Sequence, residues 1–180
     1  ALAAAAHPDD IEFMMAGTLF LLKKAGFAIH YVNLASGNCG TTTLSSHEIV
    51  AIRTAEARQA AACLGATYHP PYADDIEIYY EPRLVKRLCA LVRDIAPDII
   101  LLQSPQDYME DHLNASRIMV TAAFCRGMRN YVSDPPRAPV LTKLTVYHAL
   151  PYGLHDPLRK PVIPEFYVNT TATLAAKRRM

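Results

Sequence analysis

Short apolar runs alternate with longer amphipathic segments along the chain, and this pattern predicts strands that alternate with helices. The apolar runs, bounded by turn residues, cover 1–6, 27–34 and 98–102. The helical patterning covers 11–24, 47–64, 81–95 and 112–126. The run DIILL at 98–102 is continuously apolar, which is typical of a strand covered on both faces. We therefore expect an α/β, Rossmann-like three-layer sandwich with a mostly parallel sheet and helices on both faces.

Local signals set the expected element boundaries. The small residues of Ala1–Ala6 predict a buried strand, because Pro8 disfavours a helical residue before it. Asp9 or Asp10 can cap the first helix, and Gly26 and Gly65 follow the ends of the first two helices. Weaker patterns predict further strands at 67–72, 140–147 and 162–170.

Size and charge narrow the class of protein. The chain has 180 residues, of which 51% are hydrophobic and 19% charged, as in an ordinary globular domain. Its formal net charge of +1 predicts neither nucleic acid nor an anionic membrane as a partner. No apolar run approaches the roughly 20 residues that cross a bilayer. We expect a single domain over 1–180 that is truncated at its C-terminus.

The cysteines and the first residues bear on location. Four cysteines without a CxxC pair indicate neither a zinc ribbon nor a redox motif. Cys63 and Cys89 have apolar helical contexts, which predict buried free thiols. Ala1–Ala6 lacks a basic segment typical of a signal peptide. A reducing cytoplasm is the location that we expect.

Two polar loops carry the candidate chemistry, and both follow apolar strands. The first is His7-Pro8-Asp9-Asp10. His7 and Asp10 are ligand types that suit zinc, and they are close enough across a tight turn to share one ion. Asp9 would point elsewhere and could take a proton from metal-bound water. The alternative is that Asp9 or Asp10 only caps a helix and that His7 is an ordinary loop histidine.

The second loop, Ser104–His112, contains Asp107, Glu110 and Asp111. His112 could supply a third protein ligand, with Asp111 near enough to influence the site. The alternative is a polar loop in which Asp111 caps the next helix. Because ligands of parallel α/β sheets bind beyond the carboxyl ends of strands, the fold is expected to bring the two loops together.

Five motifs, in this order along roughly residues 1–125, resemble those of the LmbE-like, or PIG-L, deacetylase family. They are Ala6–Glu12, Ala16–Leu19, Ser36–Gly40, Ile52–Arg58 and Pro105-x-Asp107 with Asp111-His112. The resemblance implies a Rossmann-like, zinc-dependent enzyme that removes acetyl from N-acetylglucosamine linked to inositol, malate, phosphatidylinositol or another partner. Its substrate would be a small N-acetylated sugar conjugate. The sequence does not decide between a monomer and a homo-oligomer.

The same resemblance assigns roles to individual residues. His7, Asp10 and His112 would hold Zn²⁺, and Asp9 would be the general base for attack of zinc-bound hydroxide on the amide. Arg53 would grip polar groups of the substrate. Asn38 is a weaker substrate-binding candidate, and Asp111 is a second catalytic candidate.

One departure concerns Met109, which stands where the family commonly has a second histidine. That histidine is thought to aid the oxyanion or proton transfer, and a thioether can do neither. Asp111, which would orient it, loses its expected partner. His148, His155 or Tyr108 could substitute for it. The alternatives are a catalytically weakened sugar- or nucleotide-binding module and, less favoured, a metal-dependent phosphoesterase.

Overall fold

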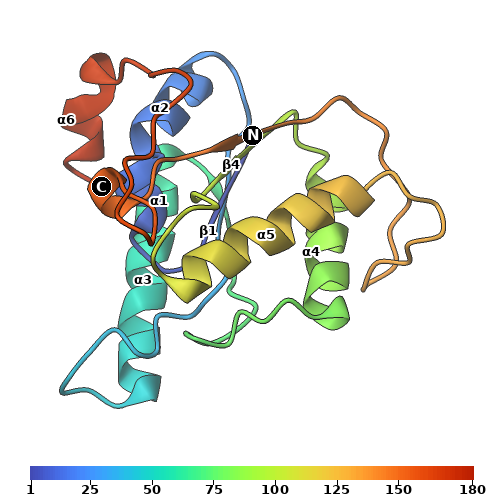
Figure 1. The fold of residues 1–180 in the computed structure, drawn as a ribbon, viewed down its shortest axis with the longest axis horizontal. Helices are drawn as coiled ribbons and strands as arrows, with labels where there is room; N and C mark the ends of the chain where they lie inside the picture. Colours follow the sequence, from blue (N-terminus) through green and yellow to red (C-terminus); the bar gives the residue numbers. More distant parts are fainter.

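The computed structural model describes all residues 1–180 and has one parallel sheet of five strands in the order β3-β2-β1-β4-β5 (Figure 1). The strands are β1 (Leu2–Ala5), β2 (His30–Asn33), β3 (Thr67–His69), β4 (Ile99–Leu102) and β5 (Thr145–His148). Every neighbouring pair is parallel. This confirms the expected α/β, Rossmann-like architecture and places β1 at the centre, with its carboxyl end between those of β2 and β4.

The helices form two layers, one on each face of the sheet (Figure 1). They are α1 (Asp10–Met14), α2 (Ala16–Lys24), α3 (Ser46–Leu64), α4 (Pro82–Ile95), α5 (Glu110–Cys125) and α6 (Leu174–Lys177). Two 3-10 turns, η1 (Tyr152–Leu154) and η2 (Thr171–Thr173), complete the elements. None of the helices is long and apolar enough to cross a membrane.

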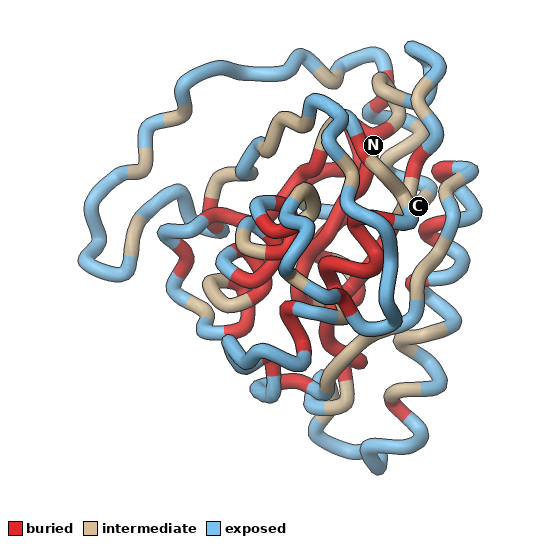
Figure 2. The backbone as a smooth tube through the Cα atoms, turned by 90° about the vertical axis from the view of Figure 1, so that its right-hand side faces the viewer, coloured by how far each residue is buried: buried red, intermediate tan, exposed pale blue.

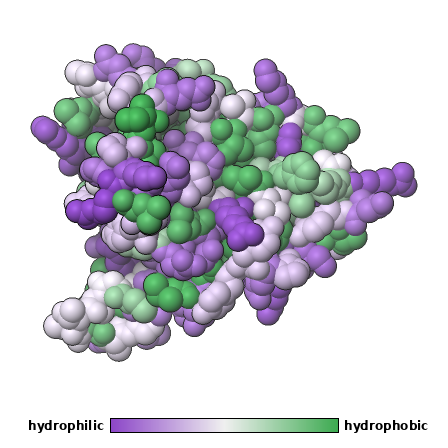
Figure 3. Space-filling model, in the orientation of Figure 1, coloured by the Kyte–Doolittle hydropathy of each residue, from purple (hydrophilic) through white to green (hydrophobic).

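The two faces of β1 belong to two separate hydrophobic cores. Figure 2 shows the buried segments gathered in the middle of the molecule, with exposed segments around them. Leu2 and Ala4 face the core of 21 buried residues beneath α4 and α5. Ala3 and Ala5 face the core of 13 buried residues beneath α1, α2 and α3. Alanines allow both helical layers to approach the central strand closely, and each fully buried Leu or Ile around it contributes about 1.5–3 kcal/mol. On the surface drawn in Figure 3, hydrophilic and hydrophobic residues are interspersed.

A buried arginine fixes the C-terminal end of α5. Arg93 of α4 is 5% exposed. Its guanidinium donates to the carbonyls of Cys125, Arg126, Met128 and Arg137 over 2.8–3.2 Å. The last carbonyls of a helix have no partner within the helix, so Arg93 supplies the missing donors.

Several sequence predictions differ from the structure. The helix expected over 11–24 is interrupted at Met15, whose φ and ψ of −123° and −23° separate α1 from α2. The strand expected over 27–34 is limited to His30–Asn33, because only those residues pair with β1. The strand expected at 67–72 ends at His69, and that at 140–147 occupies Thr145–His148.

Two further predictions were wrong because exposure depends on tertiary packing. Residues 162–170 contain no strand and lie on the surface, where Ile163 is 82% exposed and Tyr167 is 84% exposed. Cys63 is exposed, because α3 buries Ala57, Ala60, Ala61 and Leu64 and turns Cys63 away from the sheet. Cys89 is buried, as expected.

Candidate metal centre

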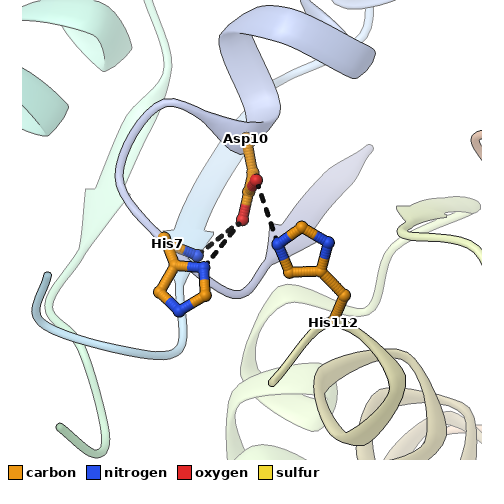
Figure 4. A group of neighbouring side chains, drawn as sticks. All are labelled: His7, Asp10 and His112. Atoms are coloured by element: carbon orange, nitrogen blue, oxygen red, sulfur yellow. Dashed lines mark hydrogen bonds and ion pairs between the residues drawn. The ribbon is translucent and has the colours of Figure 1, made fainter. Parts of the chain in front are cut away.

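Three potential metal ligands, His7, Asp10 and His112, meet at the carboxyl edge of the sheet (Figure 4). One ligand atom from each residue lies within 4.8 Å of the others. His7 follows β1, Asp10 is the first residue of α1, and His112 lies in the first turn of α5. Because β1 and β4 are parallel neighbours, the loops that follow them are brought to the same edge.

Asp10 lies between the two imidazoles. Its Oδ2 accepts a hydrogen bond from the backbone N–H of His7 at 2.7 Å and lies 3.5 Å from Nδ1 of that residue. Its Oδ1 lies 3.4 Å from Nε2 of His112. Asp10 and His112 are buried, whereas His7 is partly exposed. The group therefore borders solvent on the side of His7.

Each imidazole has a buried carboxylate on its other nitrogen. Nε2 of His7 lies 2.9 Å from Oδ2 of Asp111, and Nδ1 of His112 lies 3.0 Å from Oδ2 of Asp107. These contacts leave Nδ1 of His7 and Nε2 of His112 facing Asp10. Metal-binding histidines commonly have such carboxylate partners, which fix the tautomer and the ring orientation.

This donor set fits a divalent cation. Two imidazole nitrogens and one carboxylate oxygen are the three protein ligands found in catalytic zinc sites, which keep a further position open. Burial alone would lower the pKa of His7, but Asp10 and Asp111 raise that pKa to about 9. The direction of this shift indicates that strong negative charge faces the ring, as a cation site requires.

Asp9 is not used as a helix cap. It occupies the N-cap position of α1 with φ 100° and ψ −27°, and its side chain makes no capping hydrogen bond. Non-glycine residues in left-handed conformations cost about 1–2 kcal/mol and cluster at functional sites. The half-exposed carboxylate instead lies 2.6 Å from Nη2 of Arg53. Burial raises the pKa of Asp9, and the Arg53 guanidinium partly opposes that shift.

Arg53 reaches the site from α3. Its Nη2 donates to Asp9 and to the carbonyl of Pro8, and its Nη1 donates to Glu56 at 2.7 Å. Both terminal nitrogens thus contact protein groups. Arg53 and Glu56 form an ion pair within α3. The structure shows in addition that Arg53 holds Asp9, and its contact with a substrate stays a prediction.

The glycine loop after β2, Ser36–Gly40, is held in place by Asp75. Asp75 is 9% exposed, and its carboxylate accepts from the N–H groups of Gly37 at 2.8 Å and Cys39 at 2.9 Å. Oδ1 of Asn38 accepts from the N–H of Asp75 at 2.7 Å. The Asn38 carbonyl therefore serves this loop, and its contact with a substrate is untested.

Ile76 adds a contact that sequence patterns do not reveal. Its φ is 64°, which is unusual for a β-branched residue. Its backbone N–H donates to Oδ2 of Asp111 at 2.7 Å, the same oxygen that faces His7. The side chain of Ile76 is 60% exposed. The 74–76 loop thus helps to hold the carboxylate that orients His7.

His148, Tyr108 and His155, the three residues that could substitute for the missing histidine at position 109, differ in their contacts and exposure. Met109 is the N-cap of α5, and its N–H donates to Asp107. His148 is anchored by Nδ1, which lies 2.8 Å from the carbonyl of Gln103. Tyr108 is 61% exposed. His155 is also exposed, and its Nδ1 contacts the carbonyl of Gly153, two residues before it.

Comparison with known proteins gives one family match. The family model described as GlcNAc-PI de-N-acetylase, or PIG-L, matches residues 2–123. Those residues contain every predicted ligand and also Asp9, Asn38, Arg53 and Asp111.

Solved structures share the fold at 24% sequence identity. The 4-carboxy-2-hydroxymuconate hydratase GalB from Pseudomonas putida superimposes with a TM-score of 0.86 over 99% of this chain and 75% of its own. The N,N'-diacetylchitobiose deacetylase from Pyrococcus horikoshii gives 0.85 over 99% and 66%. A conserved protein from Thermus thermophilus gives 0.80 over 98% and 74%. Each of these proteins extends beyond the part that this chain matches.

Proposed function

This chain belongs to the GlcNAc-PI de-N-acetylase (PIG-L) family, and from that premise we propose that it is a zinc-dependent N-deacetylase. The substrate would be a small conjugate of an N-acetylglucosamine-type sugar. The observation that carries the proposal is the convergence of His7, Asp10 and His112, with Asp9 in the same turn. A zinc ion in that group would supply Lewis acidity and a lowered water pKa.

Asp9 is the proposed general base. Its carboxylate is half-exposed and therefore within reach of a water molecule that attacks the acetamide carbonyl. It would accept one proton from that water and deliver it to the nitrogen of the leaving amine, giving acetate and a free amine. Arg53 would keep Asp9 in its ionised form and hold it away from a capping position.

Asp111 and Asp107 are proposed as positioning residues. Both are buried behind the imidazoles, Asp111 against His7 and Asp107 against His112. The family resemblance suggests a catalytic part for Asp111, and these contacts favour a role through His7. Asn38 and Arg53 remain our proposed substrate contacts, with Nδ2 of Asn38 as an atom that the internal hydrogen bonds leave available.

The test combines metal analysis with an assay of acetate release. The purified protein is loaded with Zn²⁺ and given N-acetylglucosaminides. We expect Asp10→Ala and His112→Ala to lose zinc, and Asp9→Asn to keep zinc but lose turnover. Asp74→Asn, an exposed neighbour of the glycine loop, serves as the matched control. Full zinc content in clean Asp10→Ala and His112→Ala proteins would contradict the ligand assignment.

A second candidate is hydration of a carbon–carbon double bond at this site. Met109 leaves room for an activity other than deacetylation, because a thioether cannot assist an oxyanion or a proton transfer as histidine can. GalB, a hydratase by name, has the same fold. Turnover of an unsaturated hydroxy acid without acetate release would support this candidate. Binding of acetylated sugar without turnover would support a weakened binding module, and release of phosphate a phosphoesterase.

The remaining properties are also proposals. The chain spans 66–75% of the length of the three solved relatives, so the activity and partners of a whole protein go beyond what these residues carry. The four cysteines are free, which is compatible with a cytoplasmic location. We propose that residues 1–180 form one domain. Its molar mass in solution would show whether it forms a homo-oligomer.

A further inference from the structure

Two histidines outside the candidate centre lie in contact on neighbouring strands. His30 begins β2 and His69 ends β3, the edge strand of the sheet. Nδ1 of His30 lies 3.0 Å from Nε2 of His69. The ring centroids are 5.3 Å apart and the planes are inclined by 22°. Nothing in the proposed reaction uses this pair.

The separation of the two nitrogens matches that of adjacent ligands on a transition metal. Two nitrogens at about 2.1 Å from one ion lie about 3.0 Å apart at a right angle, and about 3.4 Å apart at a tetrahedral angle. The observed 3.0 Å corresponds to the right angle. Square-planar or octahedral ions such as Cu²⁺ and Ni²⁺ prefer that arrangement, whereas zinc in proteins is usually tetrahedral.

The two imidazoles have the charge state that metal binding needs. Burial lowers the pKa of His30, with a smaller contribution from His69, and burial also lowers the pKa of His69. Both rings are therefore neutral at pH 7, as metal binding requires. His30 also borders a cavity of about 370 Å³ that includes Phe27, Ala96 and Asp98. Solvent can therefore reach His30, whereas His69 does not line this cavity.

We propose that His30 and His69 form a second metal site, which binds Cu²⁺ or Ni²⁺ and joins β3 to β2. The ring that carries the shared proton would change tautomer, moving that proton to its other nitrogen, so that both rings stay neutral. A rotation of the rings would then turn both lone pairs toward one ion. The site is independent of the proposed deacetylase function, because none of its ligands belongs to the candidate metal centre.

Such an ion would stabilise the shortest strand of the sheet. β3 has three residues and pairs only with β2. The chain continues from His69 into the loop that contains Asp75 and Ile76, which fasten the glycine loop and Asp111. Stabilising β3 would therefore restrict the segment that leads to the candidate centre.

The experiment titrates the full chain with Cu²⁺ alone and follows stoichiometry by equilibrium dialysis and nitrogen hyperfine splitting by electron paramagnetic resonance. We expect two Cu²⁺ per wild-type chain, one in His69→Gln and one in His112→Ala, which removes a ligand of the candidate centre. His47→Gln, an exposed histidine of α3, is the matched control and should retain two. Cu²⁺ should also raise the midpoint of thermal unfolding of His112→Ala.

The outcomes separate this proposal from the proposed function. Equal Cu²⁺ stoichiometry in the wild type and in folded His69→Gln would overturn the site, as would equal losses in His47→Gln and His69→Gln. If His69→Gln does not fold, His30→Gln gives the same comparison. If only His112→Ala loses a Cu²⁺ ion, the result would support the candidate metal centre and overturn the proposed site at His30 and His69.

Discussion

The carboxylate of Asp111 lies 2.9 Å from Nε2 of His7, although 104 residues separate the two along the chain. The same oxygen also accepts the N–H of Ile76. Asp111 is 1% exposed, so its charge is balanced by these donors and not by solvent. The orientation of His7 therefore depends on a loop and a helix that are both distant from it in sequence.

Replacing Asp111 by alanine should weaken metal binding. His7 would lose the partner that fixes its ring, and loss of such a partner typically lowers metal affinity 10- to 100-fold, by about 1–3 kcal/mol. Competition with a chromophoric chelator measures the dissociation constant. Glu110→Ala, at the exposed neighbouring position, is the control. An Asp111→Ala protein with the affinity of Glu110→Ala would show that His7 needs no such support.

The affinity for zinc should rise with pH up to about 9. The pKa of His7 is raised from 6.5 to about 9, so a proton must leave before the ring binds a cation below that pH. We expect the association constant to increase about tenfold per pH unit between pH 7 and 8.5. Competition titrations across this range measure the slope. A flat profile would show that His7 is neutral in the metal-free protein.

The same shift predicts how the stability of chelator-treated protein depends on pH. A raised pKa means that the folded state binds the proton more tightly than the unfolded chain. The stabilisation is complete below about pH 6.5, the unfolded value, and is lost as the pH rises through about 9. Urea unfolding at pH 6, 8 and 10 should show the decrease, and His7→Gln should remove much of it.

Replacing Arg53 by methionine should move the acidic limb of kcat/KM to higher pH. Asp9 must be ionised to accept a proton, and the Arg53 guanidinium lowers its pKa. Without that charge the pKa of Asp9 rises further, because burial then acts without the opposing guanidinium. Arg58→Met, on the same helix, loses a cation–π contact with Tyr68 of β3 and should leave the limb unchanged. An unshifted limb in Arg53→Met would argue that another group is the base.

Replacing Gly37 by alanine should destabilise the protein more than replacing Gly26. Both glycines have positive φ, 78° and 95°, which costs an alanine about 1–2 kcal/mol. A Cβ at Gly37 would also lie 3.0 Å from Cγ of Arg53 and 3.3 Å from Cγ of Pro8, whereas none meets an atom within 4 Å at Gly26. We expect about 2–4 kcal/mol at Gly37, measured by urea unfolding. Equal losses would mean that Arg53 moves aside freely.

The sequence was sufficient to predict the parallel sheet and the meeting of the two polar loops. Apolar strands ending immediately before His7 and Gln103 place both loops at the carboxyl edge, because parallel strands share it. Spacing alone distinguished Asp9 from Asp10, and the structure shows them facing different partners, Arg53 and His7.

Other features of the site depend on long-range contacts that no local pattern contains. Asp75 follows Asp74 in a polar loop, and only the folded chain shows that Asp75 is buried against the Gly37 amide. Asp107 is five residues before His112, a spacing that permits contact without requiring it. Ile76 has no sequence signal for a positive φ, since β-branched residues rarely adopt one.

The attachment of α5 at both ends gives Arg93 an influence far from its own position. His112 lies in the first turn of this 16-residue helix. Arg93 donates hydrogen bonds to the carbonyls at the other end, about 20 Å away. A rigid helix transmits a small rotation along its whole length. Substitutions at Arg93 should therefore disturb the registry of the reacting groups, so some disabling mutations will map to a position that no substrate ever approaches.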